Sequence, residues 1–375
     1  MKALFVYVDG GKGHYIPAVT IKTEFDRLGH DTYLEEFFHF LDIQWLGYIN
    51  KFFWRTMLKM SRVENKVSKA CDGNKNAMHS AVKFGIKHCT RCLKSYLEEN
   101  PVDIIFTTHP YAGTVISGML KAADIDIPVY YFATDVFSAP IAAISNDLRR
   151  FYITTEEGAE IVKKMGMGDD KVVICPFPLQ QNVAESVKYT KAEARQKLGL
   201  DETLFTLQLN LGGEGLGSIS LLKELSKSGK SMQIVVIGGL NKKMKKKFES
   251  ARKELPENIK LVVAGFVKNV NEYLLASDIV VGRSGINTLL EAFYAHRPFL
   301  ITELVYTVMQ SADYVVKHGL GWNCNQNPVA QAKVILSLID DPGILNEMDS
   351  NFDNLPIEFN ARKFAEMIVT DFKSK

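Results

Sequence analysis

The chain has 375 residues, of which 46% are hydrophobic and 23% are charged, and its formal net charge is +2. This length suits two domains of ordinary size, and the composition excludes an intrinsically disordered protein. Five scattered cysteines, an odd number, argue against a disulfide framework and favour a reducing compartment. No apolar run approaches the roughly 20 residues that a spanning helix needs. A strand follows Met1 at once, so we expect a cytoplasmic protein without a signal peptide.

The first half of the chain alternates between short apolar segments and longer amphipathic segments. Such alternation predicts a parallel sheet whose two faces are covered by helices. A helix is expected over about residues 15–28, and strands are expected over 3–8, 31–35, 103–107, 129–132, 151–154 and 172–174.

A polar stretch that ends near residue 191 indicates a hinge, and the alternation then begins again. A helix is expected over 192–198 and another over 357–375, with strands over 205–210, 232–237, 260–263, 279–281 and 299–302. The sequence therefore predicts an α/β protein with two doubly wound domains, residues 1–185 and 190–356. Ligands of such sheets bind near the carboxyl ends of strands, so we expect a cleft between the two domains.

A turn of small residues follows the apolar run Ile279–Val281. The turn is Arg283-Ser284-Gly285, and it opens a segment of helical character that contains Glu291. The first N–H groups of a helix point outward beside the positive end of the helix dipole, which suits a diphosphate. Glu291 lies two turns further on and could accept hydrogen bonds from ribose hydroxyls. The sequence therefore predicts a nucleotide site in the second domain.

The order of several motifs resembles one family of GT-B glycosyltransferases. This family contains monogalactosyldiacylglycerol synthases, processive diacylglycerol glucosyltransferases and the lipid II-forming N-acetylglucosaminyltransferase. The resembling motifs are Gly265-Phe266-Val267, Ser277-Asp278, Arg283-Ser284-Gly285, Thr288 with Glu291-Ala292, and Gly10 to His14. The resemblance implies two Rossmann-like domains facing a central cleft, a UDP-sugar as donor, and a C-terminal helix, residues 357–375, that packs back on the first domain.

The resemblance also implies which residues meet the donor. The family's glycine loop beside the donor phosphates matches Gly212, Gly213 and Glu214, and the backbone of Phe266 and Val267 would meet the uracil. The turn and helix would hold the diphosphate and ribose through Arg283, Ser284, Gly285, Asn287, Thr288 and Glu291. A structural, exposed Glu291 is the alternative. Family members carry a Gln-Glu or Gln-Gln pair for the donor hexose. This chain departs from that pattern over residues 303–313, where Gln310 is the nearest candidate.

Catalysis is expected to depend on His14. In the family, the turn that contains Gly11 and Gly13 faces the acceptor, and the matching histidine is the candidate general base. Deprotonation of a hydroxyl needs a group that titrates near neutral pH, as histidine does. Asp135 is a second acid at a strand end that could orient His14 or assist as base, and Asp9 is another. The alternative for His14 is a cap of the helix that begins near Tyr15. A Rossmann dehydrogenase is disfavoured, because the glycine spacing does not match its fingerprint.

Basic residues outnumber acidic residues between positions 40 and 95, where there are eleven Lys and Arg and three Asp and Glu. Within it, apolar bulk alternates with cations at helical spacing, a pattern typical of a helix in an anionic lipid interface. The candidate membrane-binding residues are Lys51, Phe52, Phe53, Trp54, Arg55, Lys59 and Arg62. An ordinary amphipathic helix with a solvated face is the alternative.

We therefore expect a hexosyltransferase that moves galactose or glucose from a UDP-sugar to a membrane lipid such as diacylglycerol, with inversion. No acidic cluster has metal-ligand spacing, so no metal and no cofactor besides the donor are expected. Nothing resembles a nucleic-acid-binding module. The protein is expected to be peripheral on the inner face of the cell membrane. The alternatives are a UDP-N-acetylglucosamine transferase with a polyprenyl-linked acceptor and a non-catalytic UDP-sugar sensor.

Overall fold

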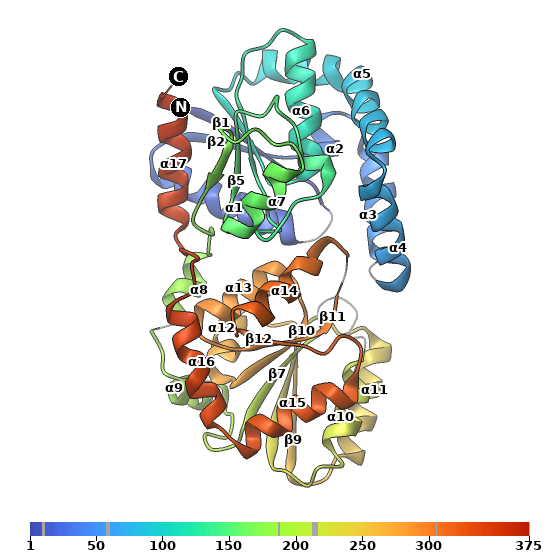
Figure 1. The fold of residues 1–375 in the computed structure, drawn as a ribbon, viewed down its shortest axis with the longest axis vertical. Coiled ribbons are helices and arrows are strands. Elements are labelled where there is room, and N and C mark those ends of the chain that lie inside the picture. The colour runs from blue at the N-terminus through green and yellow to red at the C-terminus, as the bar shows by residue number, and fades with distance from the viewer. Residues whose placement is uncertain (10–11, 58–60, 187, 212–216, 305, 375) are drawn as a thin grey trace. The chain divides into compact units, whose positions relative to one another are not determined.

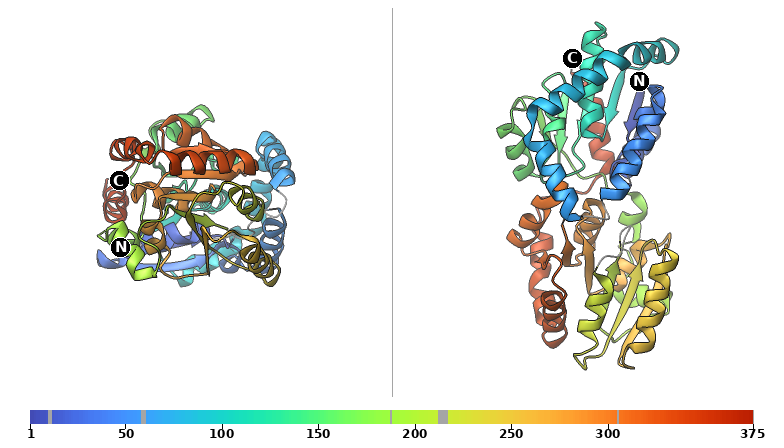
Figure 2. Two further views of the ribbon diagram at one scale, coloured as in Figure 1. Left: turned by 90° about the horizontal axis from the view of Figure 1, so that it is seen from below. Right: turned by 90° about the vertical axis from the view of Figure 1, so that its right-hand side faces the viewer.

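The computed structural model describes residues 1–375 except 10–11, 58–60, 187, 212–216, 305 and 375. The side chains of residues 54–55, 61–62, 71–73, 75–79, 186 and 307 are also outside the described part. The chain divides into two compact units. Unit 1 comprises Met1–Gln180 and Pro356–Lys375, and unit 2 comprises Gln181–Leu355. Each unit consists of one parallel sheet with helices on both faces (Figures 1 and 2), which confirms the predicted α/β class.

The sheet of unit 1 has the strand order β2-β1-β3-β4-β5-β6. Its strands are β1 (Lys2–Tyr7), β2 (Asp31–Glu36), β3 (Ile104–Thr107), β4 (Val129–Phe132), β5 (Arg150–Ile153) and β6 (Val172–Ile174). Its helices are α1 (Lys12–Arg27), α2 (Phe37–Phe40), α3 (Gln44–Met57), α4 (Ser61–Gly73), α5 (Lys75–Glu99), α6 (Pro110–Ala122), η1 (Ile141–Ala143), α7 (Glu156–Lys164) and α17 (Ala361–Lys373).

The central strands β3 and β4 of unit 1 are buried at every position because both faces of the sheet are covered. On one face, Phe5 packs against Phe25 of α1, and their ring centroids lie 5.2 Å apart. On the other face, Leu4 and Val6 join a core to which α5 and α6 contribute. The expected helix over 15–28 begins three residues earlier than predicted, at Lys12.

The C-terminal helix α17 completes unit 1. Its fully buried Phe364 contacts the rings of Phe106, Phe132 and Tyr152. The Tyr152 hydroxyl donates a hydrogen bond to the Asp371 carboxylate. The last residues of the chain therefore cover the same sheet face as α1.

Unit 2 has the strand order β12-β11-β10-β7-β8-β9. Its strands are β7 (Thr206–Asn210), β8 (Met232–Ile237), β9 (Ile259–Gly265), β10 (Ile279–Arg283), β11 (Phe299–Glu303) and β12 (Gly321–Asn323). Its helices are α8 (Gln181–Ser186), α9 (Lys191–Leu198), α10 (Ser218–Leu225), α11 (Lys242–Glu254), α12 (Val270–Ala276), α13 (Ile286–Tyr294), η2 (Tyr306–Val308), α14 (Met309–Lys317), α15 (Pro328–Asp340) and α16 (Gly343–Asp353). Side chains of α10, α11 and α15 form the core on one face of the sheet.

A buried ion pair joins α9 to the sheet of unit 2. The Arg195 guanidinium donates from Nη2 to Asp278 Oδ2 at 2.7 Å, and Nε donates to the Ala276 carbonyl at 2.9 Å. The same carboxylate accepts from the Thr206 N–H and, at the protein surface, from Lys191. Arg195 and Asp278 are 4% and 9% exposed. The Ser-Asp motif therefore has a structural role at the entry of β10.

Replacement of Asp278 by alanine is expected to lower the free energy of unfolding by about 3–5 kcal/mol, because it leaves the Arg195 guanidinium buried without a counter-charge. Urea unfolding of the full chain measures this loss. The matched control is Lys191→Ala. The Lys191 side chain is 46% exposed, so its loss should cost less than about 1 kcal/mol. Equal losses for the two variants would show that the buried pair is not the stabilising element.

Candidate functional site

Each sheet contains one place where the strand order reverses. In unit 1, the chain leaves β1 toward β2 on one side and later adds β3 on the other side. In unit 2, the corresponding pair is β7 and β10. Connections diverge at such a switch point and leave an opening at the carboxyl ends of the two strands, where ligands of doubly wound sheets bind. The predicted site residues His14 and Arg283-Ser284-Gly285 lie at these two positions.

His14 lies in the first turn of α1, directly after β1, and is half-buried. Its Nδ1 lies 2.8 Å from the Thr108 carbonyl, which follows the neighbouring strand β3, and 3.1 Å from Thr134 Oγ1. The Thr108 hydroxyl donates in return to the His14 carbonyl at 2.8 Å. His14 therefore bonds across the switch point and does not cap its own helix.

These contacts determine which nitrogen of His14 can accept a proton. A carbonyl oxygen only accepts hydrogen bonds, so Nδ1 carries the proton in the neutral ring and Nε2 carries the lone pair. Burial lowers the pKa of His14, and the hydrogen bond to Thr108 opposes this shift. The ring is therefore neutral at neutral pH and presents Nε2 as a base.

Asp135 follows β4 at the same edge of the sheet and is half-buried. Burial raises the pKa of its carboxyl to about 7. Because Nδ1 of His14 bonds to Thr108 and Thr134, it makes no hydrogen bond to Asp135. Asp135 is therefore near the candidate base but does not orient it in this structure.

The turn before α1 has one further charged group. Asp9 forms an ion pair with Lys51 of α3, and its backbone N–H donates to Glu36 Oε1 at 3.2 Å. Gly13 is exposed in the first turn of α1. Gly11 lies outside the described residues.

The switch point of unit 2 ends in the predicted turn. A Cβ on Gly282 would lie 2.8 Å from the Asn210 carbonyl, so only glycine fits where β10 passes β7. Gly285 is the N-cap of α13, and no side chain caps this helix. The Ser284 hydroxyl is buried and has no hydrogen-bond partner among the described residues. The start of α13 thus offers free backbone N–H groups and one buried hydroxyl, which suit an oxyanion.

Glu291 lies in the second turn of α13 and is half-buried, as are Asn287 and Thr288 in the first turn. Burial raises the pKa of the Glu291 carboxyl to about 7. Within the described part of the chain no cation pairs with it. A buried carboxylate without a partner is costly unless a ligand donates to it. Glu291 is thus not the exposed side chain of the alternative, and its contact with the ribose stays a prediction.

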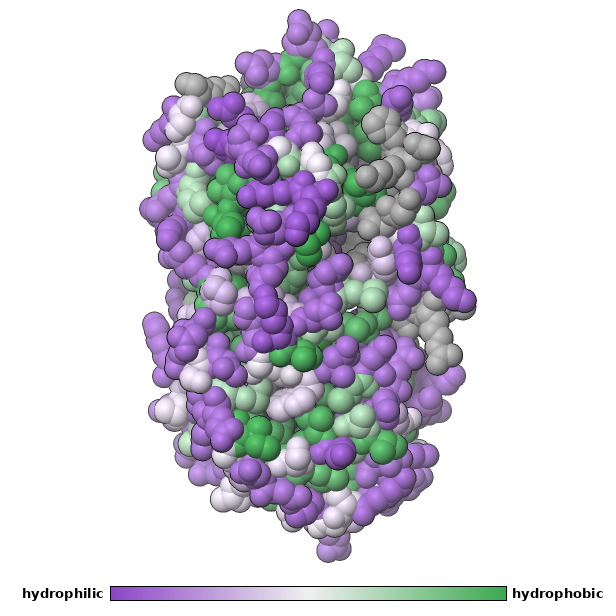
Figure 3. Space-filling view, viewed as in Figure 1, coloured by the Kyte–Doolittle hydropathy of each residue, from purple (hydrophilic) through white to green (hydrophobic). Residues whose placement is uncertain are grey.

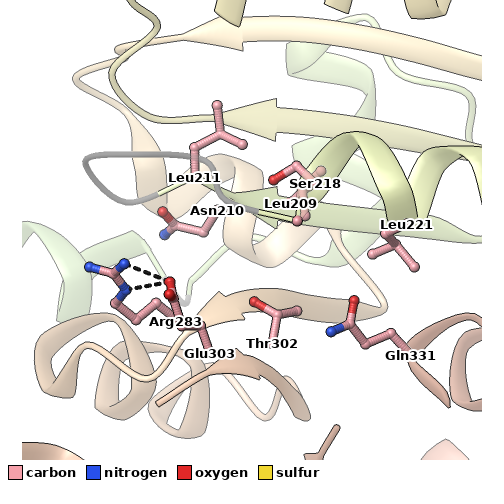
Figure 4. Close-up of a pocket in the computed structure, with 10 residues that line it drawn as sticks. Leu209, Asn210, Leu211, Ser218, Leu221, Arg283, Thr302, Glu303 and Gln331 are labelled. Carbon is pink, nitrogen blue, oxygen red and sulfur yellow. Dashed lines mark hydrogen bonds and ion pairs between the residues drawn. The ribbon is translucent and has the colours of Figure 1, made fainter. Parts of the chain in front are cut away.

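A polar pocket lies beside this turn (Figure 4). It is lined by Leu209, Asn210, Leu211, Gly217, Ser218, Leu221, Arg283, Thr302, Glu303 and Gln331. The Arg283 guanidinium faces the Glu303 carboxylate, with Nε to Oε2 at 3.0 Å. Arg283 was predicted to meet the donor, but Glu303 had no predicted role. The ion pair between Arg283 and Glu303 depends on β10 and β11 being neighbours, which no local motif indicates.

The other predicted donor residues lie at separate loops of unit 2. Gly265 has a φ of 70°, a conformation that favours glycine, and Phe266 behind it is 75% exposed. Val267 is half-buried, and Gln310 is exposed in the first turn of α14. Gln310 is not among the described residues that line the pocket beside Arg283. Gly212, Gly213 and Glu214 lie outside the described residues.

The apolar face of α3 points to solvent. Its exposed residues follow helical spacing and are Trp45, Tyr48, Ile49 and Phe52, and Phe53 is also largely exposed. An ordinary amphipathic helix buries its apolar face, so the alternative of a solvated polar face does not describe α3. Hydrophilic side chains dominate the molecular face drawn in Figure 3, which makes an aromatic surface on one helix an exception.

Of the cations expected here, the structure describes only the side chain of Lys51. Asp42 lies outside α3 with a φ of 56°, and α3 spans Gln44–Met57. Lys51 is paired with Asp9. Lys59 and the side chains of Trp54, Arg55 and Arg62 are outside the described part. None of the described helices is long and apolar enough to cross a membrane.

Comparison with known proteins identifies part of the chain. Residues 219–366 match the model of the glycosyltransferase family 28 C-terminal domain. Monogalactosyldiacylglycerol synthase of Spinacia oleracea is 27% identical over 232 residues, which are 58% of this chain and 43% of that protein. Processive diacylglycerol β-glucosyltransferase of Staphylococcus saprophyticus is 23% identical over 274 residues, 73% of this chain and 68% of that protein. The chain thus spans less than half the length of the spinach relative.

Two solved structures superpose on the whole chain. MurG of Acinetobacter baumannii gives a TM-score of 0.68 at 14% identity, covering 100% of this chain and 99% of that one. UDP-GlcNAc 2-epimerase from Neisseria meningitidis, bound to UDP-GlcNAc, gives 0.64 at 13% identity and covers both chains fully. At these identities the likeness establishes the fold. Residues 219–366 thus match the glycosyltransferase family 28 C-terminal domain, and the chain has a two-domain α/β fold of the GT-B kind.

Proposed function

We propose that the protein transfers a hexose, galactose or glucose, from a UDP-sugar to a hydroxyl of a membrane lipid, with diacylglycerol as the leading acceptor. The observation that carries this proposal is the start of α13 inside the family 28 domain. It combines a helix N-terminus, the Ser284 hydroxyl and the Glu291 carboxyl, none of which has a side-chain partner among the described residues. These groups suit a diphosphate and a ribose on one ligand.

In the proposed mechanism, the donor diphosphate accepts hydrogen bonds from the first N–H groups of α13 and from Ser284. Glu291 accepts from the ribose hydroxyls, and the backbone at Phe266 and Val267 meets the uracil. Negative charge grows on the diphosphate as the bond from the anomeric carbon to its oxygen breaks. Fixed N–H dipoles stabilise that charge, so the reaction needs no metal ion.

The acceptor is activated in unit 1. His14 Nε2 removes the proton of the lipid hydroxyl while the hydroxyl oxygen forms the new bond to the anomeric carbon. Attack from the side opposite the departing UDP inverts that carbon. The neutral state of His14, caused by burial, and the Thr108 contact that places the lone pair on Nε2 both support this role.

A lipid acceptor requires contact with a membrane, and we propose that α3 makes it at the inner face of the cell membrane. Its exposed aromatic residues suit the level of the lipid headgroups. Helix α5 of the same unit exposes four cations at helical spacing, Lys83, Lys87, Arg91 and Lys94. These cations suit anionic lipids, the role predicted for Lys51.

Two alternative functions would use the same site. A UDP-N-acetylglucosamine transferase with a polyprenyl-linked acceptor is favoured by the Arg283-Ser284-Gly285 motif. A sensor that binds UDP-sugar without transfer is favoured by the departure from the family pattern over residues 303–313. A panel of donors and acceptors separates these functions.

His14→Ala is expected to reduce glycolipid synthesis by at least about 100-fold, because general base catalysis contributes factors of this size. The measurement is thin-layer chromatography of lipid products from labelled UDP-glucose, UDP-galactose or UDP-N-acetylglucosamine, with diacylglycerol in anionic liposomes and EDTA present. The exposed His39 provides the control His39→Ala, which should keep full activity. Equal activity of both variants would exclude His14 as the base, and UDP binding without any product would favour the sensor.

The affinity for UDP-glucose is expected to rise about tenfold between pH 6 and pH 8. With a pKa of about 7, the Glu291 carboxyl is mostly protonated at pH 6, and it must ionise to accept two ribose hydroxyls. UDP-glucose itself has no phosphate that titrates in this range, so calorimetry isolates the protein group. Glu291→Gln should bind more weakly at pH 8 and lose most of the pH dependence. An unchanged pH dependence in that variant would contradict the role of Glu291.

Substitution of Ile49 and Phe52 together by serine is expected to weaken binding to anionic liposomes at least tenfold, because both side chains lose apolar area that the lipid would cover. Co-sedimentation measures this binding. The matched control replaces two equally exposed apolar residues of unit 2, Val316 and Val329, by serine. The control should bind liposomes as the wild type does. Equal binding by both double variants would remove α3 from the membrane contact.

A further inference from the structure

A second histidine lies against the candidate base. His109 follows β3 and precedes α6, and its ring packs edge to face on His14 with centroids 4.8 Å apart. The residue between β3 and His109 is Thr108, whose carbonyl and hydroxyl both bond to His14. The two rings are thus held to each other across the switch point by one short segment, although 94 residues separate Thr108 from His14 in the sequence.

The His109 ring makes no hydrogen bond to the described residues. His109 occupies the N-cap position of α6, but its side chain makes no capping hydrogen bond. Its Nδ1 is buried and has no partner among the described residues. A structural histidine at such a position normally satisfies its ring nitrogens, so this ring has another role.

The surroundings of His109 determine which ring nitrogen donates. A buried N–H without an acceptor costs more than a buried lone pair, so the proton lies on Nε2 and not on Nδ1. Burial, followed by the neighbouring His14, lowers the pKa of His109 well below its usual value, so the ring stays neutral. His14 has the opposite arrangement, with its proton on Nδ1 and its lone pair on Nε2. The pair therefore offers one acceptor and one donor side by side.

We propose that His109 is a second acceptor-binding residue, whose Nε2–H holds the lipid by an oxygen next to the hydroxyl that His14 deprotonates. The inference rests on the proposed function. A glycerolipid has such an oxygen on the carbon adjacent to its reactive hydroxyl. Contacts at two points fix the orientation of the hydroxyl toward Nε2 of His14, which lowers the entropy lost on reaching the transition state. The proposal adds a residue that no motif in the sequence indicated.

The test compares steady-state kinetics of the wild type, His109→Ala, His109→Gln and the control His39→Ala, with dioleoylglycerol in phosphatidylglycerol liposomes. Loss of one neutral hydrogen bond to the substrate should raise KM for dioleoylglycerol about two- to tenfold in His109→Ala. KM for the UDP-sugar should not change. The glutamine amide can still donate, so His109→Gln should recover most of the loss.

Four results would overturn the inference. An unchanged KM for dioleoylglycerol in His109→Ala would exclude the contact. Equal losses for both substrates, or failure of glutamine to rescue, would indicate a structural role. A wild type that makes no glycolipid from any donor would instead overturn the proposed function, and with it this inference.

A measurement that does not depend on activity tests the chemical basis. Nitrogen-15 NMR of the histidine side chains, assigned with His14→Gln and His109→Gln, distinguishes a protonated ring nitrogen from one with a lone pair. We expect the proton of His109 on Nε2 and that of His14 on Nδ1. A proton on Nδ1 of His109 would contradict the proposal whatever the activity of the variants.

Discussion

The reversal of strand order in each sheet is the constraint on which both candidate sites depend. Parallel strands need crossover connections, and a sheet that grows in both directions from its first strand leaves two adjacent connections that diverge. The opening they leave is at the carboxyl ends of β1 and β3 in unit 1 and of β7 and β10 in unit 2. Because backbone atoms approach closely there, Gly282 cannot carry a side chain. The same geometry brings His14 to Thr108 and His109.

Burial that no opposite charge offsets is the property that the candidate residues share within the described part of the chain. His14 and His109 have pKa values below the usual range, while Asp135 and Glu291 have raised pKa values of about 7, and desolvation is the largest cause in all four cases. Each group therefore tends toward its neutral form while no ligand is present. Asp278 differs from these groups, because the Arg195 guanidinium neutralises its buried carboxylate. A partner built into the chain serves stability, and a missing partner leaves a group available to a ligand.

Much of the fold followed from the sequence because apolar strands buried on both faces read as continuous hydrophobic runs. The three-residue strand β12 (Gly321–Asn323) was missed, since its pattern is too short to recognise. Local motifs predicted that His14 and Glu291 lie in helices that follow strands, and the structure has them in the first turn of α1 and the second turn of α13. His109 and Glu303 were not found, because their roles depend on which strands become neighbours. On α3, periodicity identified an amphipathic helix, but no local pattern tells whether its apolar side faces the core or the solvent.

The return of the chain from unit 2 to unit 1 makes the larger unit discontinuous in sequence. Unit 2 is one uninterrupted segment, whereas unit 1 lacks α17 until residues 361–373 are made. During synthesis, unit 2 can therefore finish folding while one face of the first sheet still exposes Phe106, Phe132 and Tyr152. Those aromatic residues form an apolar surface that favours aggregation until Phe364 covers them. Synthesis that stops before α17 would thus leave an aggregation-prone chain.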